Sequence, residues 1–348
     1  MEFYRSKHDV QIICRDHPEL SNNACHVGVK YIRNLGFRRS RSIVIDLIKD
    51  FLYSCRAILL LPKTDIVVTN TFWLPILFTF GMKPSGTKIV VNIARMPKGQ
   101  YRFYGGVDRL SAVSVAVANR VIRQAPHLRN RVRVIPNPID TTVFKPPEKS
   151  RALGGRITIL YAGRLHPEKG VHILLEAFRA LIQNQWNVEL IVVGPWTVEL
   201  GGGGGEYYRK LRTLADGLPV FFKEAIFDKV QLAEEYQKAH VFVYPSVAEK
   251  GESFGLAPLE AMATGLVPVL SRLDCFTDFF TDGVHGVSFQ HTAPDAAGAL
   301  CQAAESLLRD RRRLRDMGQR SSEKAKAYSI EAVAKLYLRD FAELTRAQ

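Results

Sequence analysis

The sequence predicts an α/β protein of two domains, each built on a parallel sheet. Its 348 residues are enough for two domains, and a hydrophobic content of 47% can fill two cores. Short β-branched apolar runs alternate with helical patterns, which is typical of parallel strands covered by helices on both faces. Four prolines between residues 136 and 147 separate two such series and indicate a linker near residues 140–156. A disordered chain is excluded.

The second half shows the alternation most clearly. Its predicted strands are four apolar runs: Ile157–Ala162, Val188–Val193, Val241–Tyr244 and Val267–Leu270. The predicted helices lie between or after them: Val171–Ile182, Tyr207–Ala215, Val230–Lys238 and Leu256–Ala263. In such sheets ligands bind at the carboxyl ends of the strands, near helix N-termini. The glycine run 201–205 is expected to be a flexible loop without chemistry.

The first half repeats the pattern less regularly. Its predicted strands are Val10–Ile13, Ile66–Thr69, Lys88–Ile93, Leu110–Val117 and Arg131–Ile135. The longest uncharged stretch, Ile66–Met82, has 17 residues and contains Asn70 and Pro75, so it is short for a membrane span. We interpret it as a buried strand followed by the start of a helix. A final helix is predicted over Ile330–Arg346.

Charge is distributed unevenly between the halves. Residues 1–150 contain 24 Lys and Arg against 10 Asp and Glu, whereas residues 151–348 contain 24 of each, so the first half holds the whole net charge of +14. A basic face attracts nucleic acid, anionic lipid or an anionic polymer. No nucleic-acid-binding signature accompanies the charge, which disfavours the first of these.

The cysteines and the first ten residues of the sequence indicate the cellular compartment. The five cysteines (14, 25, 55, 275 and 301) form no CxxC pair, so neither a disulfide framework nor a structural zinc site is expected. Residues 1–10 are polar and lack the apolar core of a secretory signal. We expect a cytoplasmic protein.

The first motif with chemical meaning is residues 163–170, GRLHPEKG, between a predicted strand and a predicted helix. Backbone N–H groups at such a turn suit an anion, and Arg164 and Lys169 add two cations. This arrangement would hold a diphosphate and stabilise it as a leaving group. Alternatively, the segment is a surface loop with two solvated cations.

The second motif is residues 252–260, ESFGLAPLE, which follow the predicted strand Val241–Tyr244. Pro258 suits the first turn of a helix, which puts Glu252 in the loop and Glu260 one to two turns into the helix. Carboxylates suit the vicinal hydroxyls of a ribose or hexose. Alternatively, the pair consists of a helix cap and a buried, paired glutamate.

Together these motifs resemble the nucleotide-sugar domain of GT4 retaining glycosyltransferases over residues 159–289. The segments that carry the resemblance agree with it in order and spacing: AGRL (162–165) with EKG (168–170), VG (193–194), VYPS (243–246), the Glu252/Glu260 pair, GLVPV (265–269) and DGVHG (282–286). Residues 131–140, RVRVIPNPID, are similar to the family's interdomain signature. The resemblance implies the GT-B fold, an α/β architecture of two Rossmann-like domains whose parallel sheets face each other across a cleft.

The resemblance also implies roles for residues. Arg164 and Lys169 would hold the donor diphosphate, and Glu252 would contact the transferred sugar. Glu260 would bind the ribose hydroxyls. Gly163 and the backbone amides near Phe254, Gly255 and Leu256 would complete the nucleotide-sugar site. No obligate metal or other cofactor is implied, because cations and a helix end can replace Mg²⁺ at a diphosphate.

The resemblance divides the chain into three parts. Residues 1–145 would form a basic acceptor-binding domain, 146–325 the nucleotide-sugar donor domain, and 326–348 a helix that packs back on the first domain. The family usually opens with a strand, a glycine-rich loop and a helix ahead of a strand like Val10–Ile13, and we expect this first unit to be missing here. The histidine that many relatives have after the strand Lys88–Ile93 is also missing. Arg95 and Lys98 are the nearest polar candidates, with Arg95 as the hypothesised contact to the donor phosphate or an acidic acceptor; a solvated basic loop is the alternative.

Transfer of a sugar from a UDP- or GDP-sugar to a polysaccharide, oligosaccharide or glycolipid is therefore the expected function. Basic residues interleave with apolar ones over Ile43–Leu61, which is typical of a segment that binds a membrane surface. We expect peripheral contact with the inner face of the membrane; an ordinary amphipathic helix is the alternative. The alternative function is a catalytically inactive nucleotide-sugar-binding protein that partners an active glycosyltransferase.

Overall fold

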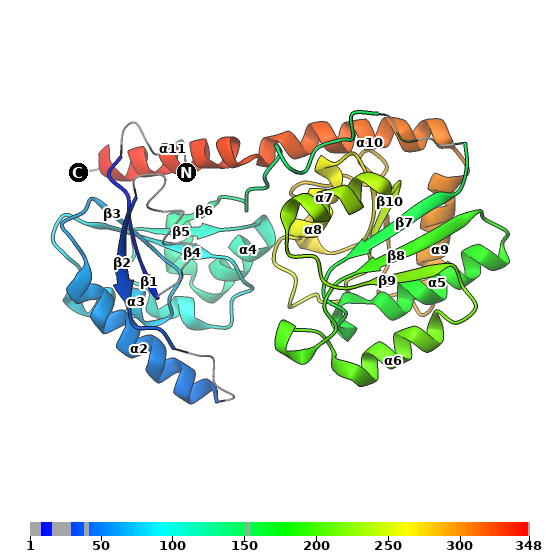
Figure 1. Ribbon diagram of the computed structural model, residues 1–348. Helices are drawn as coiled ribbons and strands as arrows, with labels where there is room; N and C mark the ends of the chain where they lie inside the picture. Colours follow the sequence, from blue (N-terminus) through cyan, green and yellow to red (C-terminus); the bar gives the residue numbers. More distant parts are fainter. Residues whose placement is uncertain (1–7, 16–28, 38–41, 150, 152–153, 347–348) are drawn as a thin grey trace. The chain divides into compact units, whose positions relative to one another are not determined.

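The computed structural model describes residues 8–15, 29–37, 42–149, 151 and 154–346 (Figure 1). The chain divides into two compact units, Met1–Ile135 with Ala334–Gln348, and Pro136–Val333. The last helix, α11 (Ile330–Arg346), begins in the second unit and belongs to the first for most of its length. Within the described residues, no helix is both long enough and apolar enough to cross a membrane.

The second unit contains a six-stranded parallel sheet in the order β12-β11-β10-β7-β8-β9. Every residue of β7, β10 and β11 is buried, as expected for continuous apolar runs in a sheet covered on both faces. The chain builds β7, β8 and β9 in one direction and then returns to add β10 on the other side of β7. The strands are β7 (Ile157–Ala162), β8 (Val188–Val193), β9 (Val220–Lys223), β10 (Val241–Tyr244), β11 (Val267–Ser271) and β12 (Val287–Phe289).

Helices cover both faces of this sheet (Figure 1). On one side α5 packs against α6 and α9, and on the other α8 packs against α10. Aspartates begin several of them: the Asp228 carboxylate accepts a hydrogen bond from the Gln231 amide at 2.9 Å at the start of α7. The helices are α5 (Val171–Gln183), α6 (Gly204–Leu214), α7 (Lys229–Lys238), α8 (Leu256–Ala263), α9 (Ala296–Leu308) and α10 (Arg311–Ala325), with short 3₁₀ turns η5 (Pro167–Lys169), η6 (Val198–Leu200), η7 (Asp274–Phe276) and η8 (Lys326–Tyr328).

The first unit contains two separate parallel sheets. Four strands pair in sequence order: β3 (Ile66–Thr69), β4 (Lys88–Ile93), β5 (Arg109–Ala112) and β6 (Val132–Val134). Two more, β1 (Gln11–Arg15) and β2 (Lys30–Asn34), pair only with each other. The helical segments are α2 (Ile43–Leu60), α3 (Trp73–Leu77), η2 (Phe78–Met82), η3 (Gln100–Phe103), α4 (Val115–Gln124) and η4 (Pro126–Arg131).

The predicted strand Leu110–Val117 is wrong in its second half. The strand β5 ends at Ala112, and α4 begins at Val115. The hydroxyl of Ser114 accepts a hydrogen bond from the Val117 amide at 3.2 Å and so caps the new helix. The apolar residues that follow Ser114 pack as a helix face, since Val117 and Val121 are both fully buried.

Ion pairs join the C-terminal helix to the sheet of the first unit. Arg109 on β5 lies 2.9 Å from the Asp340 carboxylate and 3.4 Å from that of Glu343, measured from its Nε and Nη2 atoms respectively. Arg133 on β6 also reaches Glu343, at 3.2 Å. Helix α11 therefore supplies both carboxylates that neutralise the inner basic residues of β5 and β6.

Candidate active site

The candidate site lies at the carboxyl ends of β7 and β10. Between these two strands the order of the sheet reverses, and open α/β sheets bind ligands at such a reversal. The loop after β7 contains the GRLHPEKG segment, and the loop after β10 leads to Glu252 and the start of α8. Gly170 allows the loops to meet: its φ is +68°, and a Cβ on it would lie 2.0 Å from the Pro245 carbonyl oxygen.

Lys169 and Glu252 form a buried ion pair in this site. The Lys169 Nζ lies 2.6 Å from Oε2 of Glu252, and the two side chains are only 7% and 11% exposed. The ammonium also lies 5.5 Å from the centre of the Tyr244 ring, which adds a cation–π contact. The structure thus brings together two residues that the sequence assigned to different motifs, 83 positions apart.

Two hydroxyls donate to the same carboxylate oxygen. Tyr244 and Ser246 lie 3.3 Å and 3.2 Å from Oε2 of Glu252. Burial raises the pKa of Tyr244 well above its usual range, so the phenol keeps its proton and acts as a donor. All three donors converge on Oε2, and none of these bonds reaches the other oxygen, Oε1.

Arg164 is more exposed and has different partners. Its Nη2 lies 2.7 Å from Oε1 of Glu168, and its Nη1 donates to the Gly201 carbonyl at 3.0 Å. Its side chain is 45% exposed. The first residue of the glycine run, to which the sequence assigned no chemistry, thus orients this guanidinium. Gly163, at the end of β7, precedes it and hydrogen-bonds the Val193 carbonyl at 3.0 Å through its own amide.

The start of α8 supplies a helix N-terminus without a side-chain cap. Gly255 has a φ of +97°, and a Cβ there would lie 2.6 Å from Cε1 of Phe276, so only glycine fits. Phe254 is buried against Phe279, with ring centres 5.5 Å apart, so only its backbone can face a ligand. The exposed Leu256 begins the helix. The first amides of α8 meet the electrostatic requirement for an anion.

Glu260 lies in the second turn of α8, as expected, with partners on α7. The Tyr236 hydroxyl is 3.4 Å from its Oε2. Burial raises the pKa of Glu260 to about 7, although the Tyr236 hydrogen bond and the Lys229 charge act in the opposite direction. Among the described residues Glu260 has no ion-pair partner, so the structure keeps it apart from Arg164 and Lys169.

Sequence reasoning did not assign roles to several partners in the site: Glu168, Gly201, Tyr236, Tyr244 and Ser246. Tyr244 and Ser246 were visible within VYPS, and Glu168 within GRLHPEKG. No sequence signal marked Gly201 or Tyr236, because their contacts with Arg164 and Glu260 depend on tertiary structure. The described residues contain no cluster of three or more His, Cys, Asp or Glu side chains able to hold a metal ion.

Two family models match adjacent parts of the chain. The model of glycosyl transferases group 1 matches residues 144–324, just over half of the sequence and the whole of the site above. The chain belongs to this glycosyltransferase family. The model of Glycosyltransferase Family 4 matches residues 2–143, so the first half of the chain also resembles the GT4 pattern.

The curated relatives of this chain include enzymes whose names give different substrates. A D-inositol 3-phosphate glycosyltransferase of Segniliparus rotundus is 29% identical over 245 residues, covering 68% of this chain and 52% of the relative. A lipopolysaccharide 1,2-N-acetylglucosaminetransferase of Salmonella typhimurium is 30% identical over 192 residues, covering 51% and 46%. The match thus spans about half the length of these relatives.

Solved structures show the fold of this chain. HepE of Anabaena, in complex with UDP, has a TM-score of 0.78 at 16% identity and covers 98% of this chain and 93% of its own. Sucrose-phosphate synthase of Thermosynechococcus elongatus has a TM-score of 0.75 at 18% identity, with 100% and 92% covered. The predicted α/β fold of the GT-B type is confirmed.

Proposed function

We propose that this glycosyltransferase moves a sugar, with retention of configuration, from a UDP- or GDP-sugar to a polysaccharide, oligosaccharide or glycolipid. The single observation that carries the proposal is the Lys169–Glu252 pair between β7 and β10. It offers a cation for a diphosphate and a carboxylate for sugar hydroxyls at one point of the sheet. The UDP bound to HepE and the names of the relatives support a nucleotide-sugar donor.

Arg164 and Lys169 hold the donor diphosphate, and the uncapped amides at Phe254, Gly255 and Leu256 contact its oxygens or the sugar. Glu252 accepts hydrogen bonds from the transferred sugar through Oε1, and Glu260 accepts them from the ribose. As the bond between the sugar carbon and the diphosphate oxygen breaks, the acceptor hydroxyl bonds to that carbon on the same face. Its proton passes to the departing diphosphate. The cations stabilise the charge that grows on the leaving group.

Donor binding must replace existing ion pairs. Lys169 already pairs with Glu252 and Arg164 with Glu168, at 2.6 Å and 2.7 Å. A diphosphate brings more negative charge than one carboxylate, so it attracts both cations more strongly than their present partners do. Before the donor binds, Glu168 and Glu252 neutralise the two cations. When the donor binds, its diphosphate takes the place of these glutamates as the partner of Arg164 and Lys169.

Calorimetric titration with UDP and GDP tests the donor site. We expect one nucleotide to bind and its affinity to fall at least tenfold, about 1.4 kcal/mol, in Arg164→Ala/Lys169→Ala. Because loss of Lys169 leaves Glu252 unpaired, the exposed Arg164→Ala alone provides a second variant that does not threaten folding. Arg312→Ala/Arg313→Ala on α10 removes two exposed cations elsewhere and should bind normally. Equal binding by all variants would overturn the assignment.

Turnover assays with UDP- and GDP-sugars separate a transferase from a protein that only binds donor. We expect release of nucleotide to depend on an added acceptor, with the anomeric configuration of the product read by NMR. An inverted product would contradict the retaining mechanism. Tight nucleotide binding without turnover would favour the inactive binding protein that partners an active enzyme.

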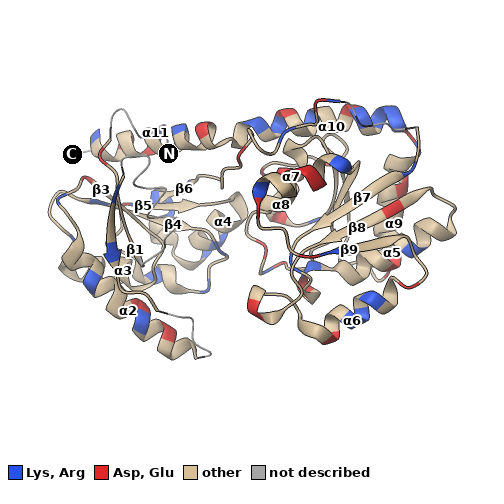
Figure 2. Ribbon diagram, in the orientation of Figure 1, with Lys and Arg blue, Asp and Glu red and all other residues tan. Residues whose placement is uncertain are grey.

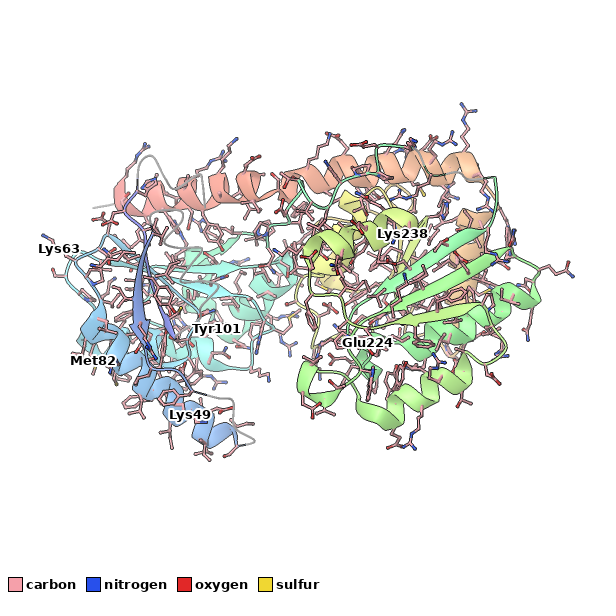
Figure 3. The ribbon with its side chains drawn as sticks, viewed as in Figure 1. Lys49, Lys63, Met82, Tyr101, Glu224 and Lys238 are labelled. Atoms are coloured by element: carbon pink, nitrogen blue, oxygen red, sulfur yellow. The ribbon has the colours of Figure 1, made fainter. Side chains whose placement is uncertain are left out.

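We further propose that α2 contacts an anionic membrane surface. Val44, Ile48, Leu52 and Leu59 are all exposed, and at 100° per residue they fall within an arc of about 80°. Arg56 and Lys49 lie along one edge of this arc, and the Lys49 Nζ also lies 3.9 Å from the Asp46 carboxylate (Figure 3 labels Lys49). Apolar side chains flanked by cations are what an interfacial helix presents to a lipid surface.

Vesicle co-sedimentation tests this contact. We expect binding to vesicles that contain phosphatidylglycerol and a marked loss in Ile48→Glu/Leu52→Glu, with nucleotide affinity unchanged. Because both side chains are exposed, the substitutions should not disturb folding. Absence of binding at low salt, where electrostatic attraction is strongest, would count against the proposal.

A further inference from the structure

A cavity of about 440 Å³ lies in the first unit, outside the donor site. Its lining consists of Arg33, Asn34, Leu35, Gly36 and Arg56. The first four residues are the end of β2 and the turn after it, and Arg56 comes from α2. The cavity therefore opens at the carboxyl end of a parallel strand, where α/β proteins bind ligands. Its volume falls within the range of small-molecule sites.

The wall of this cavity is held by hydrogen bonds between β2 and α2. Asn34 is only 4% exposed; its amide donates to the Tyr53 carbonyl at 3.1 Å and its Oδ1 accepts from the Leu35 amide at 2.7 Å. The Tyr53 hydroxyl in turn donates to the Ile13 carbonyl on β1 at 2.9 Å. The turn that follows Arg33 is thus joined to α2, the helix that contains Arg56.

The charge of the cavity selects its ligand. Among the described residues that line it, the ionisable ones are Arg33 and Arg56. Figure 2 shows basic residues on β2 and both basic and acidic residues along α2, which contains Asp46 and Asp50. Among the described residues no carboxylate lies within ion-pair distance of Arg56. Guanidinium groups bind phosphate and carboxylate through paired hydrogen bonds. A phosphate monoester, with a charge of about −1.5 to −2 at neutral pH, matches two guanidinium groups better than a single carboxylate does.

We propose that this cavity binds the phosphate monoester of a phosphorylated ligand, with Arg33 and Arg56 as its ligating residues. Asn34 is a positioning residue that orients the turn without touching the phosphate. If the first unit takes the acceptor, as the family resemblance implies, and the proposed transfer takes place, the ligand is an acceptor that bears a phosphate. The binding itself does not depend on sugar transfer.

Calorimetric titration of the full chain with glycerol 3-phosphate tests the site, with glycerol as the uncharged comparison. We expect saturable binding of the phosphate compound alone and a loss of at least tenfold in Arg33→Gln/Arg56→Gln. The matched control, Lys63→Gln/Arg120→Gln, removes two exposed cations of the same unit and should bind as the native protein does (Figure 3 labels Lys63). All four side chains are exposed, so none of these substitutions should impair folding.

A second arm distinguishes a free phosphate ligand from a lipid headgroup. Vesicles of phosphatidylcholine with phosphatidic acid present the same monoester on a surface, and vesicles with phosphatidylserine at equal mole fraction present a diester. Preference for phosphatidic acid that disappears in Arg33→Gln/Arg56→Gln, without binding of glycerol 3-phosphate, would assign the site to a lipid headgroup.

The proposal is overturned if neither probe separates Arg33→Gln/Arg56→Gln from its matched control. This outcome is independent of the donor site, because neither probe contains a nucleotide and both variants leave the second unit unchanged. Phosphate binding without any binding of UDP or GDP would overturn only the proposed glycosyl transfer. Nucleotide binding without phosphate binding would overturn only the cavity.

Discussion

Lys169 and Glu252 show at the scale of single residues how a buried charge depends on its partner. Removing one member of a buried ion pair leaves the other without compensation and typically costs 3–5 kcal/mol. We expect Lys169→Met to lower the free energy of unfolding by about 3 kcal/mol, measured by urea denaturation, because Tyr244 and Ser246 alone then face the carboxylate. Lys169→Met/Glu252→Gln should recover most of the loss. A single variant as stable as the double would show that the pair is not desolvated.

Glu260 predicts a pH dependence of stability. Its pKa is raised by burial from 4.5 to about 7, so the folded protein favours the neutral acid. The stabilising contribution of this group is complete below the unfolded pKa and decreases as pH rises to 7. At about 1.4 kcal/mol per pKa unit, the ionised group costs about 3 kcal/mol at pH 8. Glu260→Gln should therefore stabilise the protein by about 2 kcal/mol more at pH 8 than at pH 5. Equal effects at both pH values in denaturant titrations would contradict the raised pKa.

The same residue predicts a pH dependence of nucleotide binding. Ribose hydroxyls donate to a carboxylate more strongly than to a neutral acid. Nucleotide affinity should therefore rise several-fold between pH 6 and pH 8 in the native protein, as Glu260 loses its proton. Titrations of Glu260→Gln over the same range should give a flat profile, apart from any change in the nucleotide itself. A native profile that is equally flat would remove Glu260 from the ribose site.

At the scale of secondary structure, two glycines with the same backbone conformation allow a controlled test of loop packing. Gly170 and Gly217 have φ values of +68° and +70°. A Cβ on Gly170 would meet the Pro245 carbonyl oxygen at 2.0 Å, whereas one on Gly217 would meet nothing within 4 Å. Gly217→Ala should cost about 1 kcal/mol, from backbone strain alone.

We expect Gly170→Ala to destabilise the protein by at least about 2 kcal/mol more than Gly217→Ala, because the β7 and β10 loops must separate. It should also weaken UDP or GDP binding, since the loop after β7 contains Lys169. Denaturant titrations and calorimetry of both variants provide the measurement. Similar losses of stability in Gly170→Ala and Gly217→Ala would show that the loops after β7 and β10 can separate at little cost in free energy.

How well these elements could be predicted depends on whether the residues that determine each of them are close in the sequence. Leu256–Ala263 was predicted with its bounds correct, and so was Ile330–Arg346, because local signals mark their starts: Pro258 in the first turn of α8 and Ser329 directly before α11. The end of β5 was not, since Ser114 caps a helix whose residues would also suit a strand. Residues that share a motif, such as Arg164 and Lys169, were visible in sequence, whereas the pairing of Lys169 with Glu252 required the order of strands in the sheet.

At the scale of the whole molecule, the chain passes from one unit to the other twice. The two connecting segments are hydrogen-bonded to each other. The Ile139 amide donates to the Tyr328 carbonyl at 2.8 Å, and the Ile330 amide donates to the Ile139 carbonyl at 3.2 Å. The segment that follows β6 is therefore hydrogen-bonded to the segment at the start of α11. The residues that form these bonds all belong to the second unit. This pairing sets the point at which α11 begins.

The return of α11 to the first unit depends on Arg109. Its side chain is 6% exposed and that of Asp340 7%, whereas Glu343, the other partner of Arg109, is 59% exposed. Neutralising the buried Asp340 should cost more than neutralising the exposed Glu343, because water already solvates the contact that Glu343 makes with Arg109 but does not reach the one that Asp340 makes. We expect Asp340→Asn to lower the stability of the first unit by about 3 kcal/mol and Glu343→Gln to change it much less.

Hydrogen exchange followed by mass spectrometry can locate the effect. In Asp340→Asn, amides of residues 334–346 and of β5 should exchange faster, while those of β7, β8 and β10 keep the native rates. Glu343→Gln should resemble the native protein throughout. Faster exchange in both units of Asp340→Asn would mean that they unfold as one cooperative body. Unchanged exchange in α11 would show that its apolar face, including the buried Leu344, holds the helix without the ion pair.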